Sequence, residues 1–324
     1  MVHRDQPVTA SSAVRRTAAA AVVAAGHVPT VEVRREAASA VDPFVKYVVG
    51  LSDGAVVEAV RIPLERPGRF SVCVSSQVGC ALGCTFCATG RLGLARNLEA
   101  WEIVEQVRVV RRRLPAAAAG APPSRVHGVV FQGMGEPLAN LDRVLQAIEV
   151  LSEPAALRID ARAITVCTAG LPQGIRRLAR EAPQVRVGWS MGSAVATTRR
   201  ALMPVARAHA DDEVVDALVE HARVTGHAPM WAVTLLAGVN DGDDDARALA
   251  ARAAAFRAAT GRTPRISVIA YNPIGDGATP DPFARSPREG DFRAILAAAG
   301  LGSHRRYSGG GDVAAACGQL AATA

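Results

Sequence analysis

The feature that most constrains the fold of this chain is a regular alternation of short apolar runs, rich in β-branched residues, with longer segments of helical periodicity. The apolar runs predict six strands, at 70–74, 126–132, 163–168, 185–191, 230–236 and 266–271. The segments between them predict helices at 99–114, 142–151, 174–181, 212–225 and 244–259. Strands that alternate with helices form a parallel sheet with right-handed crossovers. Because a closed barrel needs eight strands, we expect an α/β fold of the partial (β/α)6 barrel type, with functional residues at the carboxyl ends of its strands.

The segments before and after this alternation are less regular. Residues 1–42, rich in Ala, Val and Arg, match no recognisable motif and are expected to form a short N-terminal accessory segment. Residues 43–69 hold two apolar stretches around Ser52-Asp53-Gly54, which predicts a β-hairpin that leads into the barrel. The barrel itself is expected over residues 70–321, including a C-terminal loop. Glycines at 309–311 favour a flexible loop, and sequence drift explains them equally well.

Three cysteines, Cys80, Cys84 and Cys87, lie in one short run with the spacing C-x-x-x-C-x-x-C. Soft thiolates at such spacing bind iron–sulfur clusters, whose usual site has four cysteines. With three local thiolates, one iron keeps an open coordination position, where a substrate or cofactor can bind. Two alternatives stay open: a zinc loop completed by a distant fourth ligand, and three incidental thiols.

Five further segments accompany this triplet. They are V-C-V-S-S-Q-V-G-C at 72–80, G-R-L-G-L-A-R-N-L at 90–98, G-M-G-E-P-L-A-N at 133–140, Y-N-P at 271–273 and A-A-C-G-Q-L at 315–320. The triplet resembles the signature of radical S-adenosylmethionine (SAM) enzymes. Together with the other segments it resembles the RlmN/Cfr family of radical SAM RNA methyltransferases, over roughly residues 45–321. The distant pair Cys73 and Cys317, each in its family context, indicates the methylating branch.

The resemblance implies an enzyme that holds a [4Fe-4S] cluster on Cys80, Cys84 and Cys87 and that uses SAM. The implied reaction methylates an adenine ring carbon, carbon 2 rather than carbon 8, in ribosomal or transfer RNA. These carbons are electron-poor and do not attack the SAM methyl group as ordinary nucleophiles, so the cofactor supplies a radical route. One alternative keeps this mechanism but takes a nucleotide, a peptide or a natural-product heterocycle as substrate. Another is a non-catalytic RNA-binding or metal-binding module.

Three catalytic residues follow from the same resemblance. Cys317 matches the methyl carrier, which forms S-methylcysteine. Cys73 matches the resolving thiol, which releases the product and forms a transient disulfide with Cys317. Glu58 matches the base that accepts the ring proton. The alternatives are an exposed strand carboxylate for Glu58 and buried structural thiols for the two cysteines.

The resemblance also implies contacts to SAM. Gly135 and Glu136 would approach its amino group, because glycine lets the backbone come close and a carboxylate pairs with an ammonium group. Asn272, in the Y-N-P segment, would hydrogen-bond the cofactor.

Two stretches expected at the cofactor site depart from the family pattern. Cys167 stands where the family often has a serine, and a thiol is a weaker hydrogen-bonding group than a hydroxyl. Ser190, Met191 and Gly192 stand where the family usually has Ser-Leu-His. These departures leave the choice of substrate open, and Cys167 as a fourth cluster ligand is a further alternative.

Composition limits the partners and the compartment. The formal net charge is +7 and the pI about 9.6, which suits a polyanionic partner such as RNA. Lys46 is the only lysine, and so arginine-rich a composition also arises from a GC-rich genome. Six cysteines fit a reduced, intracellular protein. We expect a cytoplasmic monomer without a membrane span, served by a reducing partner such as flavodoxin or ferredoxin. The stretch 15–26 superficially resembles a signal peptide, but an alanine-rich helix is the preferred interpretation.

Overall fold

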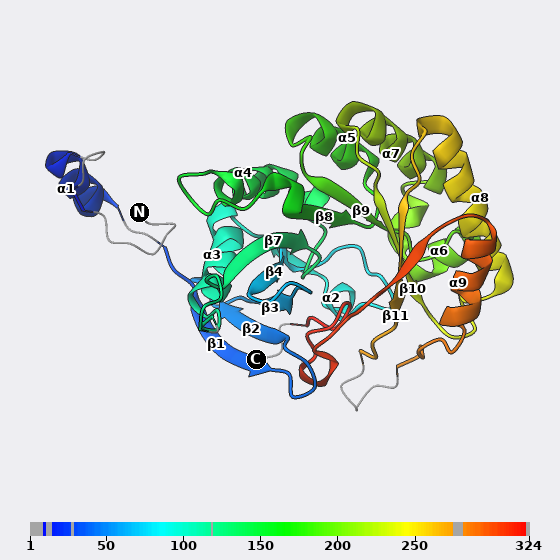
Figure 1. Ribbon diagram of the computed structural model, residues 1–324, viewed down its shortest axis with the longest axis horizontal. Coiled ribbons are helices and arrows are strands. Elements are labelled where there is room, and N and C mark those ends of the chain that lie inside the picture. The colour runs from blue at the N-terminus through cyan, green and yellow to red at the C-terminus, as the bar shows by residue number, and fades with distance from the viewer. Residues whose placement is uncertain (1–8, 11–14, 27–28, 118, 275–280, 322–324) are drawn as a thin grey trace.

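The computed structural model describes residues 9–10, 15–26, 29–117, 119–274 and 281–321. Its centre is a ten-stranded sheet in the order β1-β2-β3-β4-β7-β8-β9-β10-β11-β12 (Figure 1). From β4 onward, neighbouring strands are parallel. These strands are β4 (Arg69–Val74), β7 (Arg125–Phe131), β8 (Ile164–Thr168), β9 (Arg186–Ser190), β10 (Met230–Leu235), β11 (Arg265–Ala270) and β12 (Ser303–Arg306). The six predicted strands are present and adjacent, which confirms the α/β partial barrel, and β12 adds a seventh parallel strand.

Helices cover the outer side of this curved sheet (Figure 1). The five predicted helices are present, and α9 follows them: α3 (Ala100–Arg112), α4 (Leu141–Ser152), α5 (Pro172–Glu181), α7 (Asp211–Thr225), α8 (Asp243–Thr260) and α9 (Glu289–Ala298). In the sheet, Trp231 packs edge-to-face on Trp189, with ring centroids 5.5 Å apart, and on Phe256 of α8 at 5.4 Å. In the part of the chain that the structure describes, no helix combines the length and apolarity needed to cross a membrane.

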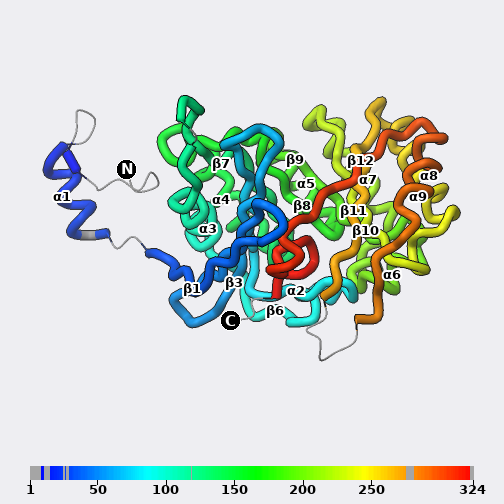
Figure 2. The backbone as a smooth tube through the Cα atoms, turned by 60° about the horizontal axis from the view of Figure 1, so that its bottom comes forward, coloured from blue at the N-terminus to red at the C-terminus, as the bar shows by residue number. Residues whose placement is uncertain are grey.

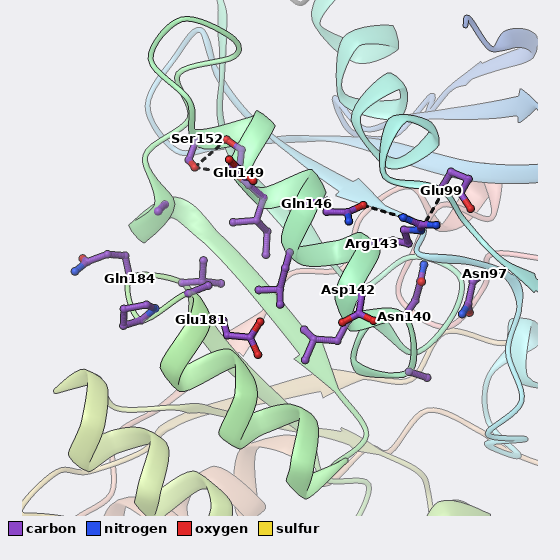
Figure 3. A pocket seen from close by; sticks show the side chains of 18 residues that line it. Asn97, Glu99, Asn140, Asp142, Arg143, Gln146, Glu149, Ser152, Glu181 and Gln184 are labelled. Carbon is purple, nitrogen blue, oxygen red and sulfur yellow. Dashed lines mark hydrogen bonds and ion pairs between the residues drawn. The ribbon is translucent and has the colours of Figure 1, made fainter.

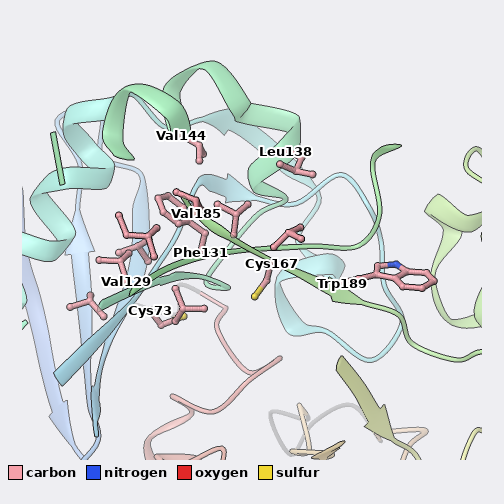
Figure 4. Close-up of a cluster of buried hydrophobic side chains, with 14 of the residues drawn as sticks. Cys73, Val129, Phe131, Leu138, Val144, Cys167, Val185 and Trp189 are labelled. Carbon is pink, nitrogen blue, oxygen red and sulfur yellow. The ribbon is translucent and has the colours of Figure 1, made fainter. Parts of the chain in front are cut away.

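Shorter elements complete the barrel. They are β5 (Gln77–Gly79), β6 (Leu94–Asn97), α2 (Ala88–Arg91) and α6 (Ala196–Leu202), with 3-10 turns at Pro137–Asn140, Ala161–Ala163, Pro204–Arg207 and Gly311–Val313. Figure 4 shows how the strands separate two environments. Leu138 and Val144 pack on the outer side, whereas the sulfur atoms of Cys73 and Cys167 lie on the side opposite to α4. The inner side of the sheet therefore carries the thiols.

The N-terminal part of the sheet is antiparallel. It consists of β1 (Glu32–Ala38), β2 (Val45–Gly50) and β3 (Val56–Pro63), and β3 is also antiparallel to β4. The predicted hairpin is confirmed, since the Gly54 N–H donates to the Leu51 carbonyl at 3.0 Å. Within the segment 1–42, β1 extends the sheet and the alanine-rich stretch forms α1 (Arg16–Ala25). The rest of that segment lies partly outside the described residues.

The C-terminal segment passes between the N-terminal strands and β11 (Figure 2). Asp42 holds it, because its Oδ2 accepts hydrogen bonds from the Tyr307 hydroxyl and the Gly310 N–H, each at 2.8 Å. A Cβ atom on Gly309 would lie 2.5 Å from the ring of Phe44. Close packing thus accounts for glycine at position 309, in place of the flexibility expected from the sequence.

Candidate active site

The three cysteines of the C-x-x-x-C-x-x-C run lie on a loop that is held at both ends. The loop starts after β5 and ends at β6, and these two strands pair antiparallel. The Cys80 N–H donates to the Gly93 carbonyl at 2.8 Å, and the Cys87 N–H donates to the Cys84 carbonyl at 3.2 Å. All three cysteines line one cavity. The sequence spacing therefore places three thiols around a common space.

These thiols fit a multi-iron centre. Burial raises the pKa of Cys80 to about 11 and also raises the pKa values of Cys84 and Cys87. Such thiols stay protonated unless positive charge compensates them, which iron would supply. Among the described residues, no group of three or more His, Cys, Asp or Glu side chains is placed to hold a single metal ion. Three soft thiols around one cavity match the donors that an iron–sulfur cluster takes.

The cavity, of about 150 Å³, lies toward the ends of the parallel strands, where the sequence analysis expected the functional residues. Residues that follow or end β7, β8, β9, β10 and β11 form its walls, together with the C-terminal segment. Besides the triplet, the predicted site residues in these walls are Gly135, Glu136, Cys167, Ser190, Gly192 and Cys317.

Glu136 supplies a carboxylate to this cavity, although its side chain is almost wholly buried. Its Oε1 accepts the Leu138 N–H at 3.0 Å, and its Oε2 accepts the Ala169 N–H at 2.8 Å. Burial raises the pKa of Glu136 to about 7, and these hydrogen bonds oppose the rise. A bound ammonium group would favour the charged form. Gly135 adopts a φ of 101°, and a Cβ there would lie 2.6 Å from the Gln77 side chain, so the backbone fits only as glycine.

A second cavity, of about 70 Å³, shares part of its wall with the first. Gln132, Cys317 and Gly318 line both cavities, whereas Cys73 lines the second. The Cys317 N–H donates to the Ser308 hydroxyl at 2.9 Å, which fixes the backbone beside the thiol. Burial raises the pKa of Cys73 to about 12, and all cysteines in the structure are free thiols. Cys317 therefore lies between the triplet cavity and Cys73.

Known proteins are similar to this chain in sequence and in overall fold, although no protein-family model matches it. A "Probable RNA methyltransferase" of Sorangium cellulosum is 61% identical over 337 aligned positions, which cover 99% of this chain and 85% of that protein. The "Dual-specificity RNA methyltransferase RlmN" of Syntrophobacter fumaroxidans is 42% identical over 280 positions, covering 86% and 76%. The crystal structure of a radical SAM methyltransferase from Sphaerobacter thermophilus is 35% identical with a TM-score of 0.84, covering 96% and 86%. The chain belongs to the RlmN family of radical SAM RNA methyltransferases.

Within this RlmN-family fold, Asn272 contacts the segment of Cys317 and is not among the described residues that line the triplet cavity. Its Nδ2 donates to the Cys317 carbonyl at 3.2 Å and to the Ser308 hydroxyl at 3.1 Å. In the structure Asn272 therefore hydrogen-bonds the C-terminal segment, whereas the sequence analysis expected it to contact the cofactor.

The stretch that departs from the family pattern divides between the cavity and the core. Ser190 and Gly192 line the triplet cavity. The side chain of Met191 lies in the hydrophobic core, and its backbone N–H donates to the Ala232 carbonyl at 2.9 Å. The structure therefore brings two of these three residues to the site.

Glu58 is fully buried on β3, so the alternative of an exposed strand carboxylate is wrong. Its Oε1 pairs with the Lys46 ammonium at 3.0 Å, and its Oε2 accepts the Ala321 N–H at 3.0 Å. It is not among the described residues that line the two cavities. The C-terminal segment covers it.

Two residues at the site were missed from the sequence. Gln132 follows β7 directly and accepts a hydrogen bond from the Cys167 thiol at 3.7 Å. Its place at the end of a predicted strand, just before G-M-G-E-P, was a usable signal. Arg306 ends β12 and lines the second cavity. The sequence offered little to find it, because the strand reads S-H-R-R and has no apolar pattern.

A larger groove, of about 1040 Å³, runs along α4 on the outside of the barrel (Figure 3). Arg143 bridges it, since its Nε pairs with Glu99 at 3.1 Å and its Nη1 donates to Gln146 at 3.1 Å. None of the described residues that line this groove is a cysteine or a predicted site residue. The candidate active site is therefore the pair of smaller cavities, which hold the cysteines and most of the predicted site residues.

Proposed function

We propose that this protein methylates carbon 2 of an adenine in ribosomal or transfer RNA, with Cys317 as the methyl carrier. The observation that carries the proposal is the position of Cys317, which lines both the triplet cavity and the cavity of Cys73. Relatives described as RNA methyltransferases support RNA as the substrate, and the net charge of +7 suits a polyanion. Carbon 2 is favoured over carbon 8 because the commoner members of the family act there.

The proposed cofactors are a [4Fe-4S] cluster on Cys80, Cys84 and Cys87 and SAM, which together would supply the methyl group and the radical chemistry that activates it. The raised pKa of Glu136 suits a carboxylate that gains its partner only when the SAM ammonium group binds. Gly135 would let the backbone approach the same group. A one-electron reductant such as flavodoxin or ferredoxin would serve as the external partner of a monomeric enzyme.

Cys317 and Cys73 would act in sequence. The Cys317 sulfur first accepts the methyl group and later joins the RNA through a methylene bridge. The Cys73 thiolate then attacks the Cys317 sulfur, and the carbon leaves with the electron pair of the broken S–C bond and is protonated to methyl. Glu58 would accept the ring proton. Since its Oε2 binds the Ala321 N–H, the end of the C-terminal segment has to shift before Glu58 reaches a base.

Two single variants test this assignment. Cys317→Ala should lose methylation. Cys73→Ala should accumulate a covalent protein–RNA adduct, seen as a nuclease-sensitive shift on a denaturing gel, because nothing resolves the thioether. The double variant should show no adduct. Normal turnover by Cys73→Ala would refute the pairing, and a trapped peptide or small molecule would point to the alternative substrates.

The ring carbon and the RNA are tested separately. Nucleoside mass spectrometry of RNA from a deletion strain, complemented with the wild type or with Cys317→Ala, should show 2-methyladenosine only with the wild type. Fractionation into ribosomal and transfer RNA assigns the substrate. The appearance of 8-methyladenosine instead would overturn the choice of carbon 2 and keep the carrier mechanism.

A further inference from the structure

Arg306 places a positive charge beside the two thiols of the proposed exchange. It is the last residue of β12 and lies opposite Ile269 of β11, so it stands where the parallel strands end. Together with Cys73 and Cys317, it lines the cavity of about 70 Å³. Its Nη1 atom is buried and has no hydrogen-bond partner among the described residues. A buried donor without a hydrogen-bond partner lowers the stability of the folded protein. A nearby group that gains a negative charge during the reaction would become its partner.

The groups that face this guanidinium are sulfur atoms. Arg306 lies in the wall of the cavity that Cys73 and Cys317 also line, and the nearby thiols Cys317, Cys167 and Cys73 raise its pKa. Cys167 in turn donates its S–H to the Gln132 side chain at 3.7 Å. In the part of the chain that is described, Arg306 forms no ion pair with a carboxylate. Arg306 is partly buried, and a thiolate formed beside it would provide a counter-charge for its guanidinium.

Cys73 is the thiol that most needs this charge. Burial raises its pKa to about 12, Cys317 raises it further, and Arg306 lowers it. Of the strands that pair with β4, β3 carries Glu58, which forms an ion pair of 3.0 Å with Lys46 of β2. The charged residues of β7, Arg125 and His127, lie at its start, whereas Cys73 pairs with Val130 near its end. Arg306 is therefore the uncompensated positive charge that acts on the Cys73 sulfur.

We propose that Arg306 is a positioning residue that stabilises the Cys73 thiolate for its attack on Cys317. The inference rests on the proposed function, since the exchange is part of it. Cys73 gives its proton to solvent, its sulfur bonds to the Cys317 sulfur, and the methylene carbon leaves with the electron pair of the S–C bond. The two sulfurs lose two electrons and the carbon gains them, so the step balances without an added oxidant. Because the disulfide is uncharged, the guanidinium would also favour its later reduction by a dithiol.

The test is the pH dependence of alkylation of Cys73 by iodoacetamide in the cluster-loaded, full-length protein, followed by peptide mass spectrometry. Below the pKa of a thiol, its alkylation rate at each pH is proportional to the thiolate fraction, because the thiolate is the nucleophile. Because the wild-type pKa of Cys73 is already about 12, a rise of about one to three units in Arg306→Met appears, at each pH in which the protein stays folded, as an alkylation rate about ten- to thousand-fold below that of the wild type. Arg306→Lys should keep most of the wild-type rate.

Arg305→Met is the matched control, because Arg305 is exposed on the same strand and pairs with Glu289 at 3.3 Å. Its Cys73 alkylation rate should equal that of the wild type. If Arg306→Met does not fold, Arg306→Gln takes its place, and an alkylation rate below that of Arg306→Lys is then expected. A wild-type rate in Arg306→Met or Arg306→Gln would overturn the proposal, and so would Arg306→Lys matching the uncharged variant.

A second measurement separates this inference from the proposed function. In an RNA methylation assay, Arg306→Met should accumulate the same covalent adduct as Cys73→Ala, and Arg306→Lys should clear it. If the wild type methylates no RNA, the proposed function fails, while the alkylation profiles still decide whether Arg306 governs Cys73. Free turnover by Arg306→Met without adduct would refute the role of Arg306 and leave the function standing.

Discussion

Replacing Lys46 by Met is the sharpest test of how the N-terminal sheet holds the site together. Lys46 and Glu58 have side chains that are 3% and 0% exposed, and their charged atoms lie 3.0 Å apart. The Lys46 ammonium also donates to the Ala314 carbonyl at 3.3 Å. Lys46→Met keeps the length of the side chain but leaves the Glu58 carboxylate buried without its counter-charge.

The expected loss is large for a single residue. Removing one partner of a buried ion pair costs about 3–5 kcal/mol, because the remaining charge stays desolvated. This is a substantial part of the roughly 5–15 kcal/mol that stabilises a typical domain. The double variant Lys46→Met, Glu58→Leu should recover most of the loss, since apolar residues often replace a buried pair without penalty. It should still lack methylation if Glu58 is the proton acceptor.

Urea unfolding of the reduced protein, followed by circular dichroism, measures these differences through the shift in midpoint at a common slope. The control is Arg162→Met, which breaks an exposed pair of 2.8 Å with Asp160 and should change stability by less than about 0.5 kcal/mol. Two results would refute the reasoning: a loss below about 1 kcal/mol for Lys46→Met, or a double variant no more stable than the single one.

Three further changes have defined outcomes. The wild type should bind about four irons per chain after anaerobic reconstitution, and Cys84→Ala should bind fewer and should not cleave SAM. Retained SAM cleavage in Cys84→Ala would contradict the cluster assignment. Burial raises the pKa of Glu136 from 4.5 to about 7. Between these two pH values the unfolded chain has lost the Glu136 proton while the folded protein still holds it. The stability of the cofactor-free protein should therefore fall as the pH rises from 4.5 to about 7. The fall should reach about 3 kcal/mol at most and be absent in Glu136→Gln, as urea unfolding across pH would show. Gly309→Ala, whose Cβ would lie 2.5 Å from the Phe44 ring, should cost about 1–3 kcal/mol, while Gly311→Ala, with open space around it, should not.

The sequence predicted the central strands well because of where they lie. Strands such as β10 and β11 have neighbours on both sides and are largely buried, so they read as continuous apolar runs. The missed strands of the ten-stranded sheet, β1 and β12, are its two edges and carry the polar sequences E-V-R-R-E-A-A and S-H-R-R. An edge strand satisfies its hydrogen bonds on one side only and needs no apolar pattern, so periodicity cannot find it.

The site divides in the same way between local and long-range information. The meeting of the three thiols proposed to hold the cluster follows from their spacing within one loop, which the sequence contains directly. The charge of Arg306 on Cys73 follows instead from the register of β12 on β11, where Arg306 lies opposite Ile269. No local pattern around Arg306 encodes that register. The family resemblance supplied the pairing of Cys73 with Cys317, but not the residue whose charge acts on both.

The hydrogen bonds that fix the backbone of Cys317 suit its proposed role, in which its sulfur acts first in the triplet cavity and then on Cys73. Its N–H and carbonyl are bound by Ser308 and Asn272 at 2.9 Å and 3.2 Å, while Asp42 binds the chain a few residues earlier. These contacts are hydrogen bonds, each worth about 1 kcal/mol net, so they can exchange one at a time without loss of the barrel core. Cys317 lines both cavities in this position, so the proposed exchange asks its sulfur to act in two spaces that it already borders. Hydrogen bonds thus hold the Cys317 segment in one position in this structure, and they are weak enough individually to break when the proposed exchange needs the segment to move.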